Sequence, residues 1–217
     1  MASTPPTIHL VHDDLPPGLS FSSGMVALDT ETTGLSLVND RLCLVQVGDG
    51  EGNVWLVKFD VGNPATPPTY AAPNLRAVLE HPRLTKLFHY ARFDLAMLQK
   101  HLGLADLGPM FCTKLASKLV RPTASKHNLR ALVAEYAGVE LDKTEQMSNW
   151  AAPTLTASQQ AYAASDVLYL HTLTAKLTEQ LAEQNLTYAY DQALKFLATR
   201  VALDLRGFPE TDLFAHH

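Results

Sequence analysis

The sequence predicts an α/β fold in which a mixed sheet of five strands is flanked by helices. Three short hydrophobic segments in the first 60 residues, separated by polar or glycine-rich connections, are typical of neighbouring strands. After residue 80 the pattern alternates between strand-like and helix-like segments. This alternation indicates a sheet that carries helices on its faces.

Each element follows from a local pattern. Strands are predicted from apolar runs at residues 25–29, 42–47, 54–59, 84–89 and 110–112. The glycine-rich residues 48–53 predict a hairpin connection between the second and third strands. Helices are predicted from apolar residues three and four positions apart at 75–79, 93–101, 114–119, 129–137, 158–185 and 188–204. The proline-rich segment 63–73 predicts a surface loop.

Composition indicates one globular domain over residues 1–217. The chain is 47% hydrophobic and 18% charged, and its length allows a sizeable core. It has no apolar run of about 18 residues and no secretion signal at its start, so we expect no membrane association. Cys43 and Cys112 lie in apolar segments, which favours free thiols in a reducing cytoplasm over a disulfide.

Asp29 and Glu31 follow the apolar run 25–28. Two acids at positions i and i+2 of a strand project from the same side of it. Burying like charges this close together is unfavourable unless a cation neutralises them. A strand that ends in a polar loop gives the same pattern, so the other segments of the chain must decide between the two readings.

Two later segments carry further acids in ordered positions. Asp94 falls in the first turn of a predicted helix after a strand, where the helix dipole alone also favours an acid. Tyr162 and Asp166 are four residues apart on one helix face. The small residues between them allow that helix to approach a neighbour closely, although a core tyrosine beside a surface aspartate is the alternative. The occurrence of all these motifs in this order favours a joint site.

The order and type of these residues resemble the DEDDy 3′-5′ exonucleases. Asp29, Glu31, Asp94 and Asp166, with Tyr162, match the four acids and the tyrosine of that superfamily. The resemblance implies an RNase H-like (DnaQ-like exonuclease) fold. It also implies catalytic roles for all five residues, the four acids being the metal ligands.

Further segments narrow the resemblance. Residues 138–146, followed by Trp150, are similar to ribonuclease D, and residues 111–119 and 203–216 are similar to nanoRNase C, a short single-domain relative. The resemblance implies a 3′-5′ exoribonuclease that hydrolyses very short RNA, chiefly dinucleotides, and that forms a ring-like homo-oligomer, an octamer. Ribonuclease D carries additional C-terminal helical domains, and we expect none here.

The expected chemistry is hydrolysis of the terminal phosphodiester with two divalent cations, Mg²⁺ or Mn²⁺, which prefer oxygen ligands. By resemblance, Asp29 bridges both cations, Glu31 and Asp166 complete the site of the attacking water, and Asp94 assists the second cation. A free tyrosine has a pKa of about 10, so we expect Tyr162 to orient the water rather than act as a full general base.

Candidate substrate contacts flank the motifs. They are Thr32, Leu35, His89, Arg92, Phe93 and Gln146. In related exonucleases a leucine at the position of Leu35 wedges against the terminal bases; a core leucine is the alternative. Arg92 is favoured over His89 as a phosphate ligand because arginine binds oxyanions bidentately. Phe93 could stack on a base or belong to the core.

The net charge of −5 favours a short substrate that is held locally, because proteins that track long nucleic acids usually carry a basic excess. A local basic patch remains compatible with this total, and Lys114, Lys118, Arg121 and Lys126 are candidates for one; a solvated helix face is the alternative. Three other functions stay open. They are a broader exoribonuclease that trims longer or structured RNA, a DNA exonuclease, and a non-catalytic nucleic-acid-binding protein.

Overall fold

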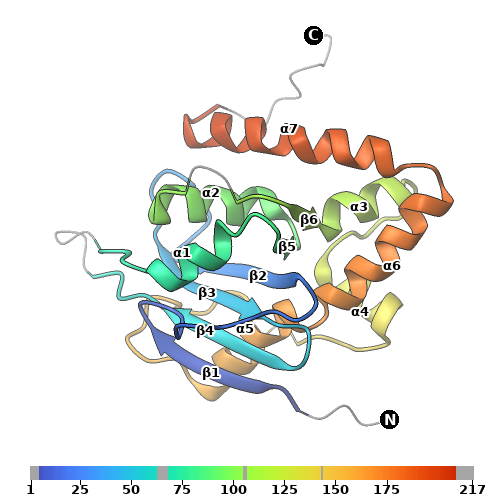
Figure 1. The fold of residues 1–217 in the computed structure, drawn as a ribbon. Helices are drawn as coiled ribbons and strands as arrows, with labels where there is room; N and C mark the ends of the chain where they lie inside the picture. Colours follow the sequence, from blue (N-terminus) through green and yellow to red (C-terminus); the bar gives the residue numbers. More distant parts are fainter. Residues whose placement is uncertain (1–4, 63–67, 105–106, 143, 209–217) are drawn as a thin grey trace.

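The computed structural model describes residues 5–62, 68–104, 107–142 and 144–208. These residues form a mixed six-stranded sheet with the strand order β1-β4-β3-β2-β5-β6 (Figure 1). The strands are β1 (Thr7–His12), β2 (Met25–Thr32), β3 (Leu42–Gly48), β4 (Asn53–Lys58), β5 (Thr85–Phe88) and β6 (Met110–Cys112). Strands β2, β3 and β4 pair antiparallel, whereas β1 joins β4, β5 joins β2 and β6 joins β5 in parallel.

The prediction of five strands was wrong by one, because β1 was missed. This strand lies at the edge of the sheet and pairs only with β4. None of its six residues is fully buried, and His9 and His12 interrupt its apolar pattern. An edge strand of this kind is defined by a non-local pairing, which a local sequence pattern does not reveal.

The helices are α1 (Pro73–Leu79), α2 (Ala91–Leu102), α3 (Thr113–Val120), α4 (Leu129–Ala137), α5 (Ala157–Leu168), α6 (Leu170–Glu183) and α7 (Thr187–Leu205). The single helix predicted over 158–185 was wrong, since two helices meet at Tyr169. The break at Tyr169 lets α5 pack against β2, β3 and β4 while α6 packs against α3 and α4.

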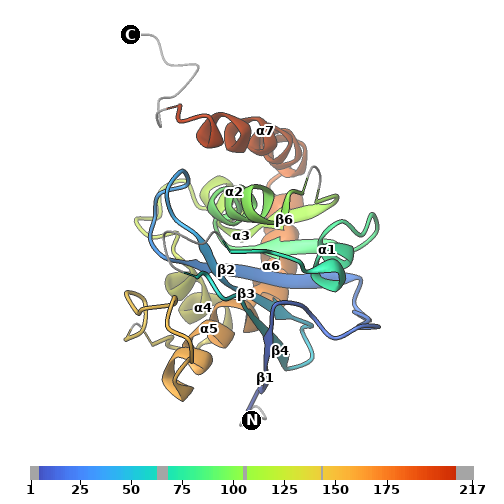
Figure 2. The same ribbon diagram turned by 90° about the vertical axis from the view of Figure 1, so that its left-hand side faces the viewer.

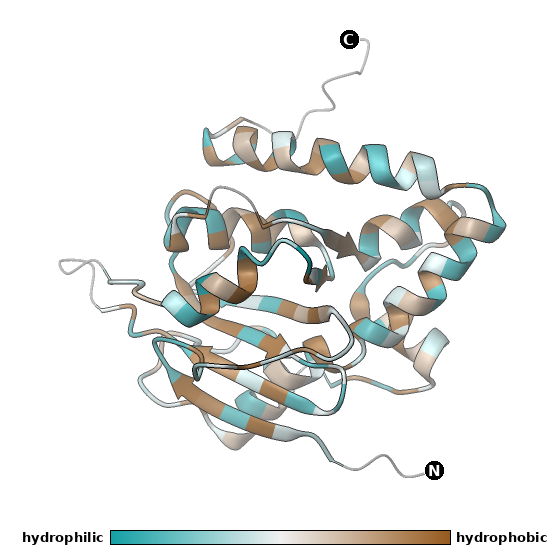
Figure 3. Cartoon of the chain, in the orientation of Figure 1, coloured by the Kyte–Doolittle hydropathy of each residue, from teal (hydrophilic) through white to brown (hydrophobic). Residues whose placement is uncertain are grey.

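Helices cover both faces of the sheet, as expected. Alternate residues of β2 point to opposite faces. Leu28 belongs to the core that includes residues of α1, α2 and α7, and Ala27 belongs to the core formed with α3, α4, α5 and α6. Figure 2 shows α2 and α7 on one side of the sheet and α4 and α5 on the other. Hydrophobic segments run through the central strands, whereas α7 alternates between hydrophilic and hydrophobic residues (Figure 3).

Several smaller expectations can be checked in the described residues. Cys43 and Cys112 are both buried and do not form a disulfide, as predicted. None of the described helices combines the length and the hydrophobicity needed to cross a bilayer. In the proline-rich segment, residues 63–67 lie outside the described part, and Pro73 begins α1. Residues 209–216 of the nanoRNase C-like tail also lie outside it.

Candidate active site

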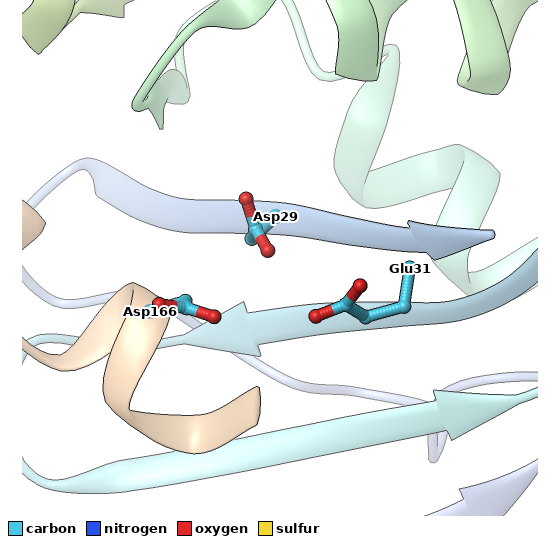
Figure 4. A group of neighbouring side chains, drawn as sticks. All are labelled: Asp29, Glu31 and Asp166. Atoms are coloured by element: carbon cyan, nitrogen blue, oxygen red, sulfur yellow. The ribbon is translucent and has the colours of Figure 1, made fainter. Parts of the chain in front are cut away.

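Three of the predicted acids converge in space. One carboxylate oxygen from each of Asp29, Glu31 and Asp166 lies within 4.8 Å of the other two (Figure 4). Asp29 and Glu31 project from the same side of β2, because residues two apart on a strand share a face. Asp166 approaches them from α5, which packs against β2. Segments more than 130 residues apart in the sequence therefore form one acidic cluster.

Local sequence explains how α5 delivers Asp166. A capping box starts the helix: the Thr156 hydroxyl accepts from the Gln159 amide at 3.1 Å, and the Gln159 side chain accepts from the Thr156 amide at 2.9 Å. Ala163 and Ala164 are completely buried and bring little bulk to the contact. On the sheet side, a Cβ atom at Gly48 would lie 3.2 Å from Val167. Small residues on both elements thus permit the close approach.

Asp94 joins the site from the first turn of α2. Its side chain is buried, and its Oδ1 accepts a hydrogen bond of 2.6 Å from the hydroxyl of Thr30. Thr30 lies between the two acids of β2, so this bond ties α2 to the acid-bearing strand. Asp94 also lies near enough for its charge to raise the pKa of Asp29. It is nevertheless not one of the three residues that meet within 4.8 Å.

Burial raises the pKa of all four carboxyls, and repulsion by neighbouring acids adds to it at Asp29, Glu31 and Asp166. Burial, followed by the charges of Asp94, Asp166 and Glu31, raises the pKa of Asp29 well above its usual value. Burial, with Asp166 next, raises the pKa of Glu31 to about 9. Burial also raises the pKa values of Asp94 and Asp166 to about 7. A cluster of this kind is destabilised by its own charges and gains most from a bound cation.

The donors around the cluster suit a hard divalent cation. Every candidate ligand is a carboxylate oxygen, and no histidine or cysteine of the described residues joins the group. Gln46, which is opposite Asp29 on β3, supports it by donating from Nε2 to Asp29 Oδ2 at 3.3 Å. The Gln46 side chain is fully buried, so this neutral donor fixes one carboxylate oxygen without supplying a counter-charge.

Tyr162 lies one turn before Asp166 on α5 and lines the same cleft. Burial, and then the charge of Asp166, raises its pKa above the usual value for tyrosine. Its hydroxyl therefore stays protonated at neutral pH and can donate a hydrogen bond. The ring of Trp150 lies beside it, with the centroids 6.0 Å apart. Trp150 itself is buried.

The acids line a cleft of about 470 Å³. Five of the six predicted substrate residues line it too, namely Thr32, Leu35, His89, Phe93 and Gln146. The side chain of Leu35 is 84% exposed, which excludes the alternative of a core leucine. Among the lining residues that the prediction missed are Tyr90, Leu129 and Met147. Tyr90 lies between His89 and Arg92, two predicted substrate residues, and this position in the sequence was the only signal that could have found it.

Arg92 does not line the cleft, in contrast to the prediction. Its guanidinium donates two hydrogen bonds to the carboxylate of Asp204 in α7, of 2.6 and 2.7 Å. Arg200 donates to the same carboxylate. The bidentate geometry that favoured Arg92 as a phosphate ligand is thus used to join α2 to α7. A phosphate would have to displace a buried aspartate to bind there.

His89 lines the cleft but carries no positive charge there. The hydroxyl of Thr113 donates to the carbonyl of Phe88 at 3.1 Å, so it accepts from Nδ1 of His89 at 2.8 Å. Burial, followed by the charge of Lys114, lowers the pKa of the ring to about 3, so the ring is neutral at neutral pH. A neutral, partly buried ring brings no positive charge to a phosphate group, so His89 is not suited to a phosphate-binding role.

Comparisons with known proteins agree with this geometry. Residues 19–182 match the family described as 3′-5′ exonuclease. A structure of Brucella melitensis NrnC bound to pGG is 42% identical, has a TM-score of 0.88, and covers 98% of this chain and 100% of that one. The structure of Brucella melitensis NrnC with bound Mg²⁺ is 40% identical, with a TM-score of 0.87 and coverage of 97% and 100%.

A curated relative, ribonuclease D of Cronobacter turicensis, is 35% identical over 158 residues, which are 73% of this chain and 40% of that protein. The chain thus spans about two fifths of the length of the curated ribonuclease D that it matches. These similarities confirm the RNase H-like (DnaQ-like exonuclease) fold. The chain belongs to the 3′-5′ exonuclease family, in its ribonuclease D-like group and beside NrnC, a nanoRNase C.

Proposed function

We propose that this chain is a metal-dependent 3′-5′ exoribonuclease that hydrolyses very short RNA, chiefly dinucleotides, to nucleoside monophosphates. The observation that carries the proposal is the convergence of Asp29, Glu31 and Asp166 within 4.8 Å, in a cleft of a 3′-5′ exonuclease fold. The similarity to NrnC supports the substrate, since that protein has been described in complex with pGG.

Two divalent cations, Mg²⁺ or Mn²⁺, fit the four carboxyls of the cleft. Asp29, Glu31 and Asp166 would hold one cation, and Asp29 with Asp94 would hold the other. When bound, such cations lower the pKa of a water ligand and stabilise the charge that develops on the leaving oxygen. NrnC has been described with bound Mg²⁺, which supports the choice of ion.

The chain itself orients the reactants. The protonated hydroxyl of Tyr162 lies one helical turn from Asp166, where it would donate to the attacking water or to a phosphate oxygen and so aim the nucleophile. The neighbouring Trp150 ring limits the positions that Tyr162 can adopt. Gln46 would keep the carboxylate of Asp29 in one orientation.

Apolar groups in the cleft would bind the bases. Leu35 and Met147 line the cleft and are 84% and 94% exposed, so a base packed against them would remove apolar surface from water. Phe93 adds an aromatic face. Thr32 and Gln146 supply polar groups for the sugar or the base edges.

A broader ribonuclease D-like exoribonuclease, which trims longer or structured RNA, is the second candidate. It is favoured by the similarity to ribonuclease D, which extends over 73% of this chain. The same acids would perform the same hydrolysis in both cases. The two candidates therefore differ only in the length of RNA that the cleft accepts.

We also propose that the chain forms a homo-oligomer, an octamer by its family resemblance. Three exposed aromatic side chains lie along α7 or shortly after it, namely Tyr188, Phe196 and Phe208. Exposed aromatic residues are frequent at protein interfaces. Light scattering coupled to size exclusion will give the subunit number, and a monomer at micromolar concentration would contradict this part of the proposal.

The test uses purified protein with 5′-labelled RNA. The wild-type protein with Mg²⁺ should convert pGG to mononucleotides. Any slow shortening of a 5′-labelled trinucleotide should first give the labelled dinucleotide, because removal starts at the 3′ end. Chelation should stop turnover, and restored Mg²⁺ should recover it. Asp29→Ala and Asp166→Ala should be inactive, yet keep the circular dichroism spectrum of the wild type. Hydrolysis by the chelated protein, or by either variant at the wild-type rate, would contradict the proposal.

A further inference from the structure

Tyr90 has an unusual backbone conformation at the wall of the cleft. It lies at the junction of β5 and α2 and adopts φ 76° and ψ 46°, in the left-handed region. This region costs a non-glycine residue on the order of 1–3 kcal/mol, and such residues concentrate at functional sites. The Tyr90 side chain is 39% exposed and lines the cleft. Its hydroxyl has no hydrogen-bond partner among the described residues, so it is a donor available to a ligand.

Lys114 lies over the ring of Tyr90, with Nζ 4.0 Å from the ring centroid. It forms no hydrogen bond or ion pair with a described residue, whereas Lys100 donates from Nζ to two carbonyls at 2.9 Å. Burial, with Lys118 next, lowers the pKa of Lys114. The ring thus holds a partly desolvated cation that lacks an anionic partner. An incoming anion would restore the interactions that this ammonium group has lost.

The topology explains why these two residues meet. β5 and β6 are parallel neighbours, so Tyr90 and Lys114, each just beyond the end of its strand, emerge at the same edge of the sheet. α2 and α3 begin at this edge as well. The amino ends of helices carry partial positive charge, which adds to the charge of Lys114. Lys114 and the two helix ends thus place positive charge next to Tyr90 at the wall of the cleft, beside the acid cluster to which α2 contributes Asp94.

The two phosphate ligands predicted from the sequence, His89 and Arg92, are not suitable. Arg92 is bound to Asp204, and His89 is a partly buried, neutral ring. A nucleic acid nevertheless brings phosphate groups into a cleft that already contains four carboxyls. Lys114 and Tyr90 carry the remaining donors beside the wall of the cleft, and a phosphate group is the ligand that suits an ammonium group paired with a phenol hydroxyl.

We propose that Lys114 and Tyr90 together bind a phosphate group of the RNA substrate. The ammonium group and the phenol hydroxyl donate to its oxygens, and the Tyr90 ring holds the ammonium group in place. The inference rests on the proposed exoribonuclease function and adds a substrate site to it. A phosphate contact of this kind acts on binding and therefore on KM, because it is made equally in the ground state and the transition state.

The test compares Lys114→Met, Lys114→Arg and Tyr90→Phe with the wild type, using GG dinucleotides with and without a 5′-phosphate at several salt concentrations. Lys114→Met should raise KM about 10–100-fold, as expected for a lost charged hydrogen bond, and change kcat less than about 2-fold. It should also reduce the slope of log KM against log salt by about 0.7, because one phosphate contact is lost. Lys114→Arg should retain most of the affinity, and Tyr90→Phe should raise KM a few-fold.

Lys195→Met is the matched control, since it removes an exposed lysine of α7 and should leave KM and the salt slope unchanged. If Lys114→Met raises KM only for the 5′-phosphorylated dinucleotide, Lys114 binds the terminal phosphate. If KM rises equally for both dinucleotides, Lys114 binds the linking phosphate. A Lys114→Met protein with wild-type KM and salt slope overturns the inference, whether or not its melting temperature falls. If the wild type cleaves neither dinucleotide, the proposed function fails instead.

Discussion

Replacing Glu31 by glutamine separates the electrostatic strain of the acid cluster from its metal-binding role. The change keeps the shape of the side chain and removes its charge. In the metal-free protein, burial and the charges of Asp166 and Asp94 raise the pKa of Glu31 from 4.5 to about 9. Between these two pH values the unfolded chain binds fewer protons than the folded one. Glu31 therefore lowers the stability progressively as the pH rises through this window.

The size of the effect follows from the pKa shift. At about 1.4 kcal/mol per pKa unit, Glu31 lowers the free energy of unfolding at pH 7 by at most about 3 kcal/mol. Water in the cleft screens part of this, so we expect Glu31→Gln to stabilise the metal-free protein by about 1–3 kcal/mol. The melting temperature should rise by about 2–4 °C for each kcal/mol in a chain of this length.

The assay is thermal unfolding at pH 7, first with chelator and then with saturating Mg²⁺. A cation at one hundred times its Kd stabilises the wild type by about 2.7 kcal/mol, and the variant should lose much of this gain because it lacks one ligand. With Mg²⁺ the stability advantage of Glu31→Gln over the wild type should therefore nearly disappear or reverse. Hydrolysis by the variant should fall at least about 100-fold. Glu183→Gln, which alters an exposed carboxyl at the end of α6, is the control. It should change neither the stability in chelator nor the gain from Mg²⁺ by more than about 0.5 kcal/mol. A Glu31→Gln protein that is less stable than the wild type in chelator, or that gains as much from Mg²⁺, would refute this reasoning.

Three further changes test other parts of the site. Tyr162→Phe should reduce kcat by about 10²–10⁴-fold with the metal dependence unchanged; an unaltered rate would reduce Tyr162 to a packing residue. Gln46→Met, which removes the donor to Asp29 but keeps the volume, should raise the Mg²⁺ concentration for half-maximal activity by about 10–100-fold, and a wild-type titration curve would show that Asp29 needs no such support. When the pH is lowered from 7 to 5, the free energy of unfolding measured in urea should fall less for His89→Gln than for the wild type. The reason is that burial lowers the pKa of His89 to about 3, so the unfolded chain takes up more protons as the pH falls below about 6.5; equal losses in both proteins would contradict this.

The acidic site was predictable because its signals are local. The spacing of Asp29 and Glu31 on a strand, and of Tyr162 and Asp166 on a helix, determines which side chains share a face before any tertiary contact forms. The sequence order of the motifs then indicated that they belong to one site. The structure confirms the convergence of Asp29, Glu31 and Asp166, and it places Tyr162 in the same cleft.

The features that were missed depend on partners distant in the sequence. β1 is a strand because it pairs with β4, and its own sequence pattern does not indicate this pairing. Arg92 looked like a phosphate ligand because Asp204, its actual partner, lies 112 residues away. The contact of Lys114 with Tyr90 joins two strand ends that only the parallel pairing of β5 and β6 brings together.

The length of RNA that the cleft accepts tests the central claim most directly. The measurement is kcat/KM with Mg²⁺ for 5′-labelled RNAs of two, three, seven and about twenty nucleotides, with Asp29→Ala as the inactive control. The account predicts rapid cleavage of the dinucleotide while the longer RNAs remain nearly intact. Stepwise shortening of all four RNAs at similar rates would contradict it and would identify the chain as a general ribonuclease D-like trimming enzyme.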